Sequence, residues 1–501
     1  MYITHPLIKE NTVEKRAYQE NILKVAEKKN TLVVLPTGIG KTIIALLLAV
    51  KRIEKYPESQ IMILAPSRPL AAQHKKTFAS ILNFPENEFQ LVTGTIKPEK
   101  RVEKYNAKFI FSTPQTIQND IKENRISLEN FSLLVIDEAH RAVGNYPYVF
   151  IAKKYMVFSK NPLILALTAS PGSDEEKIKE ICNNLFIKAI EIKTEEDEDV
   201  KPYIKQVEIE VVRVDFDTVL ENLRERLNKI LKHYAEILKE QGFKFKTKKE
   251  LIELQHAIGK KISSGDKSLF NIMKVIADAL KVWHAIELLE TQSITALKNY
   301  LNRLKETPQG KRIFQIEEFK EIYFDLLGMK EIHPKIKKLR EIVENILKQN
   351  PNAKIIVFSH YRDNIEEIYE ELKKVPNCKP CYLIGQAGEK GLSQKEQIKI
   401  IEAFENGEYN CLIGSPVSEE GLHIPAVDIG IFYDAVPSEI RLIQRRGRIG
   451  RVKFGKIIFI LLRKSRDEAY YYTALRKEKK MKKSLKIMKD FGIRKKTLFD
   501  F

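Results

Sequence analysis

The stretch TLVVLPTGIGKTIIALLLAV at residues 31–50 decides the fold of the first part of the chain. TLVV is a β-branched apolar run typical of a buried strand, and TIIALLLAV has the composition of a buried helix. The loop between them contains Gly38, Gly40, Lys41 and Thr42. Backbone N–H groups at such glycines wrap a phosphate, the lysine reaches the β- and γ-oxygens, and the threonine hydroxyl binds Mg²⁺. The stretch therefore predicts a strand, loop and helix that hold ATP and Mg²⁺.

The phosphate loop departs at one place from the strict Walker pattern, because Leu35 stands where that pattern has glycine. Thr37 lies inside the loop and belongs to the same expected nucleotide site. The residues that carry the chemistry are all present, so we keep the prediction.

Length and charge limit the class of protein. The chain has 501 residues and a formal net charge of +19. That length suggests about three domains, and the charge suggests a polyanionic partner. No apolar run reaches the roughly 20 residues that cross a bilayer, the N-terminus lacks a secretory layout, and the few cysteines suit a reducing compartment. We expect a cytoplasmic, nucleoid-associated protein with no membrane partner.

Short apolar runs alternate with helix-length segments in two separate series, which predicts two parallel sheets covered by helices. The first series lies at 31–36, 60–66, 108–113, 131–137 and 163–168, and the second at 354–359, 381–385, 409–415, 427–434 and 455–462. Between the two series, segments such as VLENLRERLNKILKHYAEIL have helical spacing. We expect an α/β protein with two domains of parallel sheet and an all-helical insertion, divided into residues 1–210, 211–330 and 331–475, with a basic tail at 476–501.

DEAH at 137–140 follows the apolar run SLLVI. The carboxyl end of a strand is where a doubly wound sheet binds its ligand. Asp137 there can hold the Mg²⁺ that Thr42 also contacts, and Glu138 can deprotonate the attacking water. Two adjacent carboxylates could also be a helix cap, but their pairing with the phosphate loop favours catalysis.

QRRGRIGR at 444–451 carries four arginines. An arginine that enters a water-poor cleft stabilises the charge that develops during phosphoryl transfer. Taken alone, the run fits a solvated basic helix or a nucleic-acid patch better. The run lies in the second predicted sheet domain, whereas the phosphate loop lies in the first. If these arginines act in hydrolysis, the two domains must close on one nucleotide.

These motifs, in this order, resemble those of a superfamily 2 helicase over most of the chain. The family's two motor domains are RecA-like, so the resemblance implies that fold for both sheets. It also implies roles for residues in RAYQ, APSRPLAAQ, STPQT, TASPG, SPVSEEGLHIP and QRRGRIGR. By resemblance, Gln19 reads adenine, and Gln444, Arg448 and Arg451 act in hydrolysis. The resemblance assigns nucleic-acid contacts to Ser67, Arg68, Thr93, Gly94, Thr113 and Gln115, and coupling of hydrolysis to movement to His140, Thr168, Ser170 and Gly421.

A closer resemblance rests on GQAGEKGLSQKEQ, EEGLHIP and YDAVPSEIRLIQRRGRIGR, which look like the archaeal Hef helicase and its relative, the Fanconi anaemia group M translocase. That group has a helical insertion thought to grip duplex DNA and acts on forked or branched DNA. His423 stands where related motifs have aspartate, so this chain lacks one carboxylate of the family's motif. Nothing resembles the acidic nuclease motif of longer Hef proteins, so we expect no strand cleavage.

Two basic segments allow more than one interpretation. GFKFKTKK at 242–249 interleaves aromatics with Lys244, Lys246, Lys248 and Lys249. The lysines could neutralise phosphates and a phenylalanine could stack on a base, or the phenylalanines could pack into the core of the insertion. The segment at 475–491 could be a solvated helix face or a contact to the DNA backbone.

The last residues, KKTLFDF at 495–501, resemble the archaeal box that binds the sliding clamp PCNA. Leu498, Phe499 and Phe501 would fill the clamp pocket, and Lys495 stands where the family usually has glutamine. The alternative is that these side chains fold back onto the motor domain.

The resulting hypothesis is a DNA-stimulated ATPase that translocates on or remodels branched DNA. One rival is a double-stranded RNA motor related to Dicer and the RIG-I-like proteins, which share an insertion at this place. A rival of another class is a non-catalytic scaffold on branched DNA. The presence of both Lys41 and Glu138 argues against the scaffold, since a conformational latch needs no water-activating carboxylate.

Overall fold

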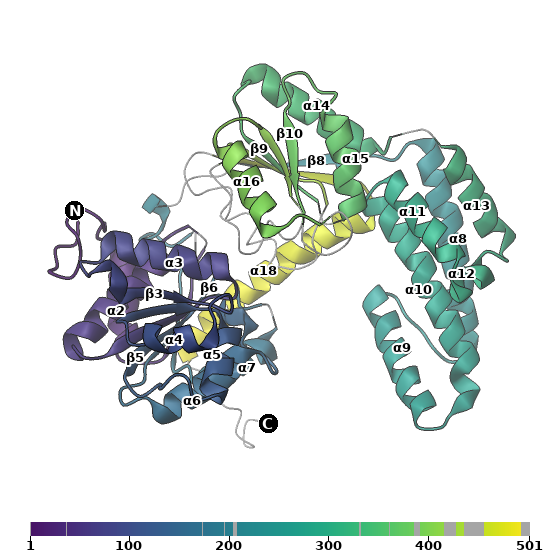
Figure 1. The fold of residues 1–501 in the computed structure, drawn as a ribbon. Helices are drawn as coiled ribbons and strands as arrows, with labels where there is room; N and C mark the ends of the chain where they lie inside the picture. The colour runs from purple at the N-terminus through teal and green to yellow at the C-terminus, as the bar shows by residue number, and fades with distance from the viewer. Residues whose placement is uncertain are drawn as a thin grey trace.

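The structure is a computed structural model that describes residues 2–36, 38–172, 174–194, 196–203, 208–329, 332–359, 361–384, 391–414, 427–434 and 455–491. A helical bundle lies between two α/β domains along the chain (Figure 1). We call the bundle the insertion, and the α/β domains before and after it the first and the second motor domain.

The first motor domain contains a seven-stranded parallel sheet with the order β3-β4-β2-β5-β6-β1-β7. Its strands are β1 (Thr31–Val34), β2 (Gln60–Leu64), β3 (Phe89–Val92), β4 (Phe109–Ser112), β5 (Phe131–Ile136), β6 (Ile164–Thr168) and β7 (Ala189–Ile192). Its helices are α1 (Ala17–Ala26), α2 (Lys41–Lys55), α3 (Arg68–Ile81), α4 (Pro98–Lys104), α5 (Pro114–Lys122), α6 (Pro147–Phe158) and α7 (Glu175–Asn184), with short 3₁₀ turns η1 (Glu86–Glu88), η2 (Ala139–Arg141) and η3 (Lys201–Tyr203).

Both faces of this sheet are buried. Successive residues of a strand point to opposite faces, so Val33 packs on one side with Ile63, and Leu32 packs on the other with Met62. This is why the strands appear as continuous apolar runs in the sequence.

The second motor domain contains a six-stranded sheet, also parallel, with the order β10-β11-β9-β12-β13-β8. Its strands are β8 (Glu208–Val214), β9 (Ile355–Phe358), β10 (Pro380–Leu383), β11 (Cys411–Gly414), β12 (Ile429–Phe432) and β13 (Lys456–Leu462). The helices that cover it are α14 (Pro334–Gln349), α15 (Arg362–Leu372) and α16 (Gln394–Glu405).

Strand β8 corrects one expected boundary. We placed residues 1–210 in the first motor domain, but β8 runs from Glu208 and pairs along its whole length with β13 of the second sheet. Without β8, the long apolar strand β13 would expose an unpaired edge. The second motor domain is therefore built from two separate parts of the chain, and the insertion lies between them.

The insertion is helical throughout its described residues. It contains α8 (Thr218–Glu240), α9 (Lys248–Ser263), α10 (Phe270–Thr291), α11 (Ile294–Lys305), α12 (Pro308–Ile313) and α13 (Glu317–Gly328), with the turn η4 (Lys267–Leu269). The long helices α8 and α10 pack side by side, and leucines of α8 such as Leu223 and Leu227 are buried at helical spacing.

One long helix, α18 (Arg466–Phe491), connects all three parts (Figure 1). It begins beside β13, where Arg466 donates a hydrogen bond to Glu290 of the insertion at 3.0 Å. Farther along, Met481 and Leu485 are buried in the first motor domain, where α18 packs on β7. The expected tail at 476–501 is therefore, up to Phe491, the second half of this helix.

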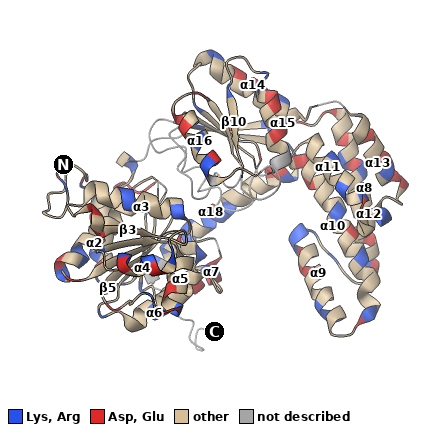
Figure 2. Cartoon of the chain, viewed as in Figure 1, with Lys and Arg blue, Asp and Glu red and all other residues tan. Residues whose placement is uncertain are grey.

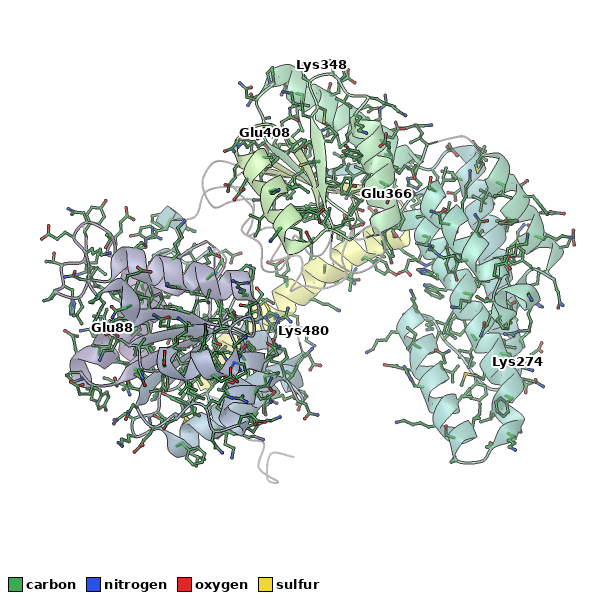
Figure 3. The ribbon with its side chains drawn as sticks, viewed as in Figure 1. Glu88, Lys274, Lys348, Glu366, Glu408 and Lys480 are labelled. Carbon is green, nitrogen blue, oxygen red and sulfur yellow. The ribbon has the colours of Figure 1, made fainter. Side chains whose placement is uncertain are left out.

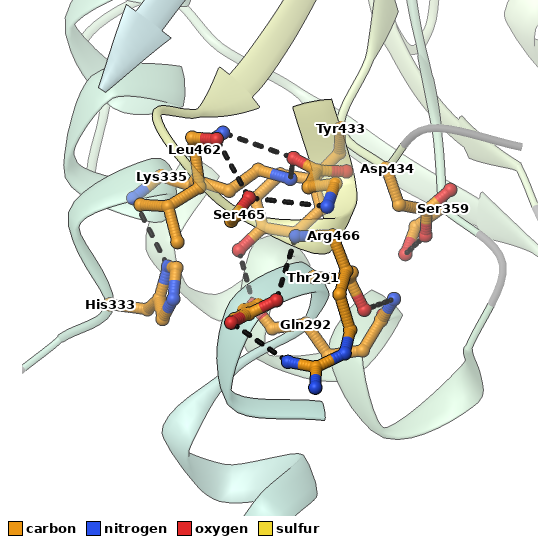
Figure 4. Close-up of polar contacts among 12 residues, drawn as sticks. Thr291, Gln292, His333, Lys335, Ser359, Tyr433, Asp434, Leu462, Ser465 and Arg466 are labelled. Carbon is orange, nitrogen blue, oxygen red and sulfur yellow. Dashed lines mark hydrogen bonds and ion pairs between the residues drawn. The ribbon is translucent and has the colours of Figure 1, made fainter. Parts of the chain in front are cut away.

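The insertion meets the second motor domain through a buried polar junction (Figure 4). Lys335 donates to Asp467 of α18 at 2.7 Å, and both side chains are fully buried. The Lys335 ammonium also lies 4.6 Å from the centre of the Tyr433 ring. Tyr433 in turn donates to the carbonyl of Gln292, at the end of α10, at 2.8 Å.

The expected fold class is confirmed, with two parallel-sheet domains and a helical insertion between them. Among the described helices, none combines the length and the apolar character that crossing a membrane requires.

His333 at the junction predicts that stability depends on pH. Its Nε2 contacts the carbonyl of Leu289 at 3.1 Å, and burial together with the charge of Lys335 lowers its pKa from 6.5 to about 3. Between these values the unfolded chain binds a proton that the folded chain does not. The contribution of His333 to the free energy of unfolding is therefore fully present above pH 6.5. It is lost as the pH drops through this window, by up to about 1.4 kcal/mol per pH unit.

We expect the thermal denaturation midpoint of the wild type to fall between about pH 6.5 and 5, and that of His333→Gln to fall less steeply. His256→Gln is the matched control, since His256 is exposed. Parallel pH profiles for the wild type and His333→Gln would contradict the assignment.

Candidate functional site

Strand order divides the predicted site residues of the first motor domain into two groups. Apart from Gln19, which lies on α1 ahead of β1, the predicted nucleotide and coupling residues follow β1, β5 and β6, whereas the predicted nucleic-acid contacts follow β2, β3 and β4. In the sheet these are two neighbouring sets of strands, and their carboxyl ends share one edge. The two groups of predicted residues therefore lie side by side along one edge of the sheet.

The phosphate loop has the backbone that wrapping an anion requires. Gly38 and Gly40 have φ angles of 86° and 89°, in the region that favours glycine. A Cβ atom on Gly40 would also lie only 2.6 Å from Nε2 of Gln19. Lys41 donates to the Leu35 carbonyl at 3.1 Å, so its ammonium lies at the loop.

Helix α1 presents the expected base-reading residue to this loop. Gln19 is 2% exposed, and its Oε1 has no hydrogen-bond partner among the described residues. A buried acceptor without a donor is costly, and the exocyclic amine of adenine could supply that donor. Tyr18 holds the loop from the same helix by donating to the Ile39 carbonyl.

Asp137 is held by a residue that the sequence analysis did not identify. His74 of α3 is buried, and its Nε2 lies 2.8 Å from the Asp137 carboxylate. Burial raises the pKa of Asp137, but the hydrogen bond from His74 and the charges of His74 and Lys41 outweigh it, so the net shift is downward. The carboxylate is therefore ionised and oriented.

Glu138 stands in a strained conformation. Its φ of 50° and ψ of 49° are left-handed, which costs a non-glycine residue of order 1–3 kcal/mol and is typical of functional sites. Its Oε2 lies 3.3 Å from His140 Nδ1, without the alignment of a hydrogen bond. The strained residue thus stands just after the carboxyl end of β5, with its carboxylate beside His140.

Three of the predicted coupling residues lie together behind Glu138. His140 Nδ1 is 3.3 Å from Thr168 Oγ1, which donates to the Ser170 carbonyl at 3.1 Å. The Ser170 hydroxyl contacts Met481 Sδ of α18 at 2.8 Å. A continuous series of contacts therefore leads from the candidate catalytic carboxylate to the helix that joins the domains.

The donor set fits ATP and Mg²⁺. Asp137 supplies an ionised carboxylate and Thr42, at the start of α2, supplies a hydroxyl, and both are hard oxygen ligands of the kind Mg²⁺ prefers. The two glycines and Lys41 supply the cradle for the phosphates.

The predicted nucleic-acid contacts gather where β2, β3 and β4 end. Ser67 precedes α3, and its hydroxyl is buried with no hydrogen-bond partner among the described residues, while the neighbouring Arg68 is exposed. Thr93 and Gly94 follow β3, and Thr113 directly precedes α5, whose second residue is the exposed Gln115. The hydroxyls, an arginine and two helix N-termini form a surface suited to phosphates.

Several predicted residues lie outside the described part of the chain. They are Thr37 of the phosphate loop, Gly421 and His423, Gln444, Arg448 and Arg451 of the arginine motif, and Leu498, Phe499 and Phe501 of the clamp box. Their roles stay predictions.

The basic segment of the insertion is only partly available to DNA. Phe243 and Phe245 are partly buried against the insertion core, which favours the packing interpretation over base stacking. Lys248 donates to Glu287 of α10 and is engaged within the protein. Lys244 and Lys246 are exposed, as is Lys249, whose contact with Glu253 is 3.5 Å long.

Lysines also line the outer face of α18 (Figure 2). Lys480, labelled in Figure 3, is exposed on the part of the helix near the first motor domain, whereas Met481 beside it is buried. The basic segment at 475–491 thus combines a packed face with a solvated face.

His74 had a signal in the sequence that we did not use. Ala71, His74, Phe78 and Ile81 are the buried residues of α3 and follow helical spacing. A histidine in such an apolar stripe needs a buried partner, and the nearby DEAH carboxylate supplies one.

Comparison with known families agrees with this architecture. The "DEAD/DEAH box helicase" family matches residues 16–178, and the "Helicase conserved C-terminal domain" family matches residues 334–453. Between them, residues 215–333 match a family described as "Putative ATP-dependent RNA helicase, helical bundle".

Similar proteins occur in archaea and fungi. The crystal structure of the Pyrococcus furiosus Hef helicase domain is 42% identical, with a TM-score of 0.73, and the match covers 93% of this chain and 99% of that domain. A Methanocaldococcus jannaschii protein named "Putative ATP-dependent RNA helicase" is 44% identical over 97% of this chain, and the ATP-dependent DNA helicase fml1 of Schizosaccharomyces pombe is 34% identical over 92%. The matches span 63% and 58% of those two proteins.

The geometry predicts distinct defects for two substitutions in the nucleotide site. Lys41→Ala should weaken both ATP binding and turnover, because this ammonium lies at the phosphate loop. Glu138→Gln should bind ATP normally yet lose roughly 10²-fold or more in rate, the scale of removing a general base. Binding of a fluorescent ATP analogue and phosphate release measure the two effects separately. Near-normal turnover by Glu138→Gln would refute the catalytic role.

Proposed function

Because the chain belongs to the superfamily 2 helicases, in the group of the Hef helicase domain, we propose that it is an ATP-driven motor that remodels forked or branched DNA. The observation that carries the proposal is the strand order of the first motor domain. The candidate nucleotide residues after β1 and β5 and the candidate strand contacts after β2, β3 and β4 belong to neighbouring strands of one sheet, which supports the proposal. A motor needs this proximity, since hydrolysis in one site must change contacts in the other.

In the proposed reaction, Lys41 and the glycine loop hold the triphosphate, and Gln19 accepts a hydrogen bond from adenine. Mg²⁺, when bound by Asp137 and Thr42, would neutralise charge on the phosphate oxygens. Glu138, in a left-handed backbone conformation just after β5, takes a proton from the attacking water. His74 keeps Asp137 ionised and oriented.

Arg448 and Arg451 of the second motor domain, together with Gln444, would complete the site when the two motor domains close. They stabilise the charge that develops on the γ-phosphate, so hydrolysis is expected only in the closed state. Each turnover then opens and closes the motor domains, and Ser170, in contact with α18, would sense this movement.

Two lines of support favour DNA over RNA. The matched crystal structure is a Hef helicase domain, and relatives that match more than nine-tenths of this chain carry the name ATP-dependent DNA helicase. The name of the Methanocaldococcus jannaschii relative and the helical-bundle family favour the rival, an RNA-directed motor.

The proposal predicts a ranking of nucleic acids as activators. We expect ATP hydrolysis by the whole chain to be stimulated most by a forked DNA, less by a linear duplex of the same length, and least by double-stranded RNA. The Glu138→Gln variant is the control for contaminating ATPase. Stronger stimulation by double-stranded RNA would favour the rival, and no stimulation by any nucleic acid would refute the proposal.

The exposed lysines of the insertion refine this test. Replacing Lys244, Lys246 and Lys249 by alanine should weaken fork binding and reduce the slope of log affinity against log salt by up to about 0.9 for each phosphate that is no longer neutralised. Lys248→Ala is the matched control, because its ammonium already pairs with Glu287. If the triple variant and Lys248→Ala change fork affinity and salt slope equally, the three exposed lysines make no specific contact with DNA.

We also propose that the final segment binds a PCNA-type sliding clamp through Leu498, Phe499 and Phe501. A tether of this kind raises the local concentration of the motor at replication forks without new DNA contacts, and it suits a nucleoid location. A peptide covering residues 488–501 should bind the clamp of the same organism in a calorimetric titration. No binding at about tens of micromolar, or equal binding by Leu498→Ala with Phe501→Ala, would refute it.

A further inference from the structure

A buried charged cluster lies under the candidate strand contacts and is not used in nucleotide chemistry. Asp120 of α5 is fully buried, and Arg101 of α4 donates to both of its carboxylate oxygens, from Nε at 2.7 Å and from Nη2 at 2.6 Å. Tyr105 donates at 2.5 Å and Arg125 at 3.2 Å. Burial raises the pKa of Asp120, but the hydrogen bonds from Arg101 and Tyr105 outweigh it and leave the pKa below its usual range.

The remaining donor of Arg101 reaches the loop after β3. Nη1 of Arg101 donates to the carbonyl of Ile96 at 2.7 Å. Ile96 N–H in turn donates to the carbonyl of Thr93 at 3.0 Å and closes the turn that contains Gly94. One guanidinium therefore joins this turn to the carboxylate of α5.

The same two segments carry four threonines, of which Thr95 is exposed and Thr113 half-buried, whereas Thr93 and Thr116 are buried. We call Thr93, Gly94, Thr95, Thr113 and Thr116 the threonine ledge. Thr93 and Thr95 are linked through their hydroxyls at 3.1 Å, and Thr113 and Thr116 at 2.9 Å. A Cβ atom on Gly94 would lie 3.8 Å from Thr116 Oγ1, so the two halves of the ledge are adjacent.

Stability alone does not require a buried ion pair at this position. Taking an ion pair out of water costs several kcal/mol per ion, and apolar side chains of similar volume often serve a core equally well. A bidentate arginine pair, however, fixes distance and orientation. Here the pair fixes the position of the turn at 93–96 relative to α5, whose first turn carries Thr116 and whose last turn carries Asp120.

We propose that Arg101 and Asp120 are positioning residues of the strand-binding site: their buried pair holds the two halves of the threonine ledge in the arrangement that binds the phosphates of one nucleic-acid strand. The inference rests on the proposed function, since it assumes that the ledge contacts the strand. It adds which residues shape that contact. The pair follows β3 and β4, whereas the nucleotide residues follow β1 and β5, so nucleic-acid affinity and basal hydrolysis should respond separately.

The test uses the whole chain and measures ATP hydrolysis against the concentration of forked DNA. Arg101→Gln keeps Arg125 beside Asp120 but loses the bidentate pair and the bond to Ile96. We expect its half-saturating DNA concentration to rise about tenfold or more, with basal and saturated rates within about twofold of the wild type. Arg101→Lys keeps the charge but not the fork of donors. Its half-saturating DNA concentration should lie between those of the wild type and of Arg101→Gln.

Arg52→Gln is the matched control for loss of a buried arginine. Arg52 is 7% exposed and Arg101 is 6% exposed, and Arg52 donates to the carbonyls of Ser132 and Asn161 near the opposite ends of the strands. The Arg52→Gln variant should have a lower thermal midpoint than the wild type but the same half-saturating DNA concentration.

Four outcomes overturn the inference. An unchanged half-saturation in Arg101→Gln, while the wild type is stimulated by DNA, removes the positioning role and leaves the proposed function standing. An equal rise in Arg52→Gln reduces the effect to general destabilisation. A wild type that no nucleic acid stimulates removes both the proposed function and the inference. If Arg101→Gln does not fold, the same comparison is made with Arg101→Lys, and a wild-type half-saturation in that variant overturns the inference.

Discussion

The ammonium of Lys335 and the carboxylate of Asp467 lie 2.7 Å apart with neither exposed to water. Such a pair tolerates little change, because removing one partner leaves a buried charge and costs about 3–5 kcal/mol. Asp467 is one of the first residues of α18, and Lys335 is one of the first of α14. The adjacent contacts of Tyr433 with Gln292 and of Arg466 with Glu290 bring in the insertion. The insertion, the second sheet and the start of α18 are therefore fixed to one another.

The first motor domain is joined to this assembly in a different way. Its described contacts with α18 include the packing of Met481 and Leu485, a hydrogen bond between Ser484 and Glu175, and an ion pair between Lys489 and Glu191. Ser170, at the coupling motif, touches the same helix. With 26 residues, α18 is about 39 Å long at 1.5 Å per residue, so this single helix links the edge of the first sheet that carries Ser170 to Glu290 of the insertion.

Much of the fold could be predicted because its strands are buried on both faces. Runs such as LILALT and KIIFILL are apolar without interruption, and both are strands. Three strands lie outside the two predicted series, namely β3 (FQLV), β7 (AIEI) and β8 (EIEVVRV). Each carries polar or charged residues, which interrupt its apolar run. For the site, the phosphate loop and DEAH were readable from local spacing. The pairs Asp137 with His74 and Arg101 with Asp120 could not be predicted from local spacing, because each pair joins separate elements. A single charged residue in a sequence is normally expected to face solvent.

The burial of Met481 and Leu485 in the first motor domain also bears on how the chain folds during synthesis. These side chains complete an apolar cluster that otherwise consists of residues between Leu32 and Ile192. A ribosome releases the first sheet long before it releases α18, so the face of that sheet against β7 stays uncovered while the insertion and the second sheet are being made. The domain that is synthesised first is therefore the last to close its core, and in that interval the exposed face is a surface for chaperones or for aggregation.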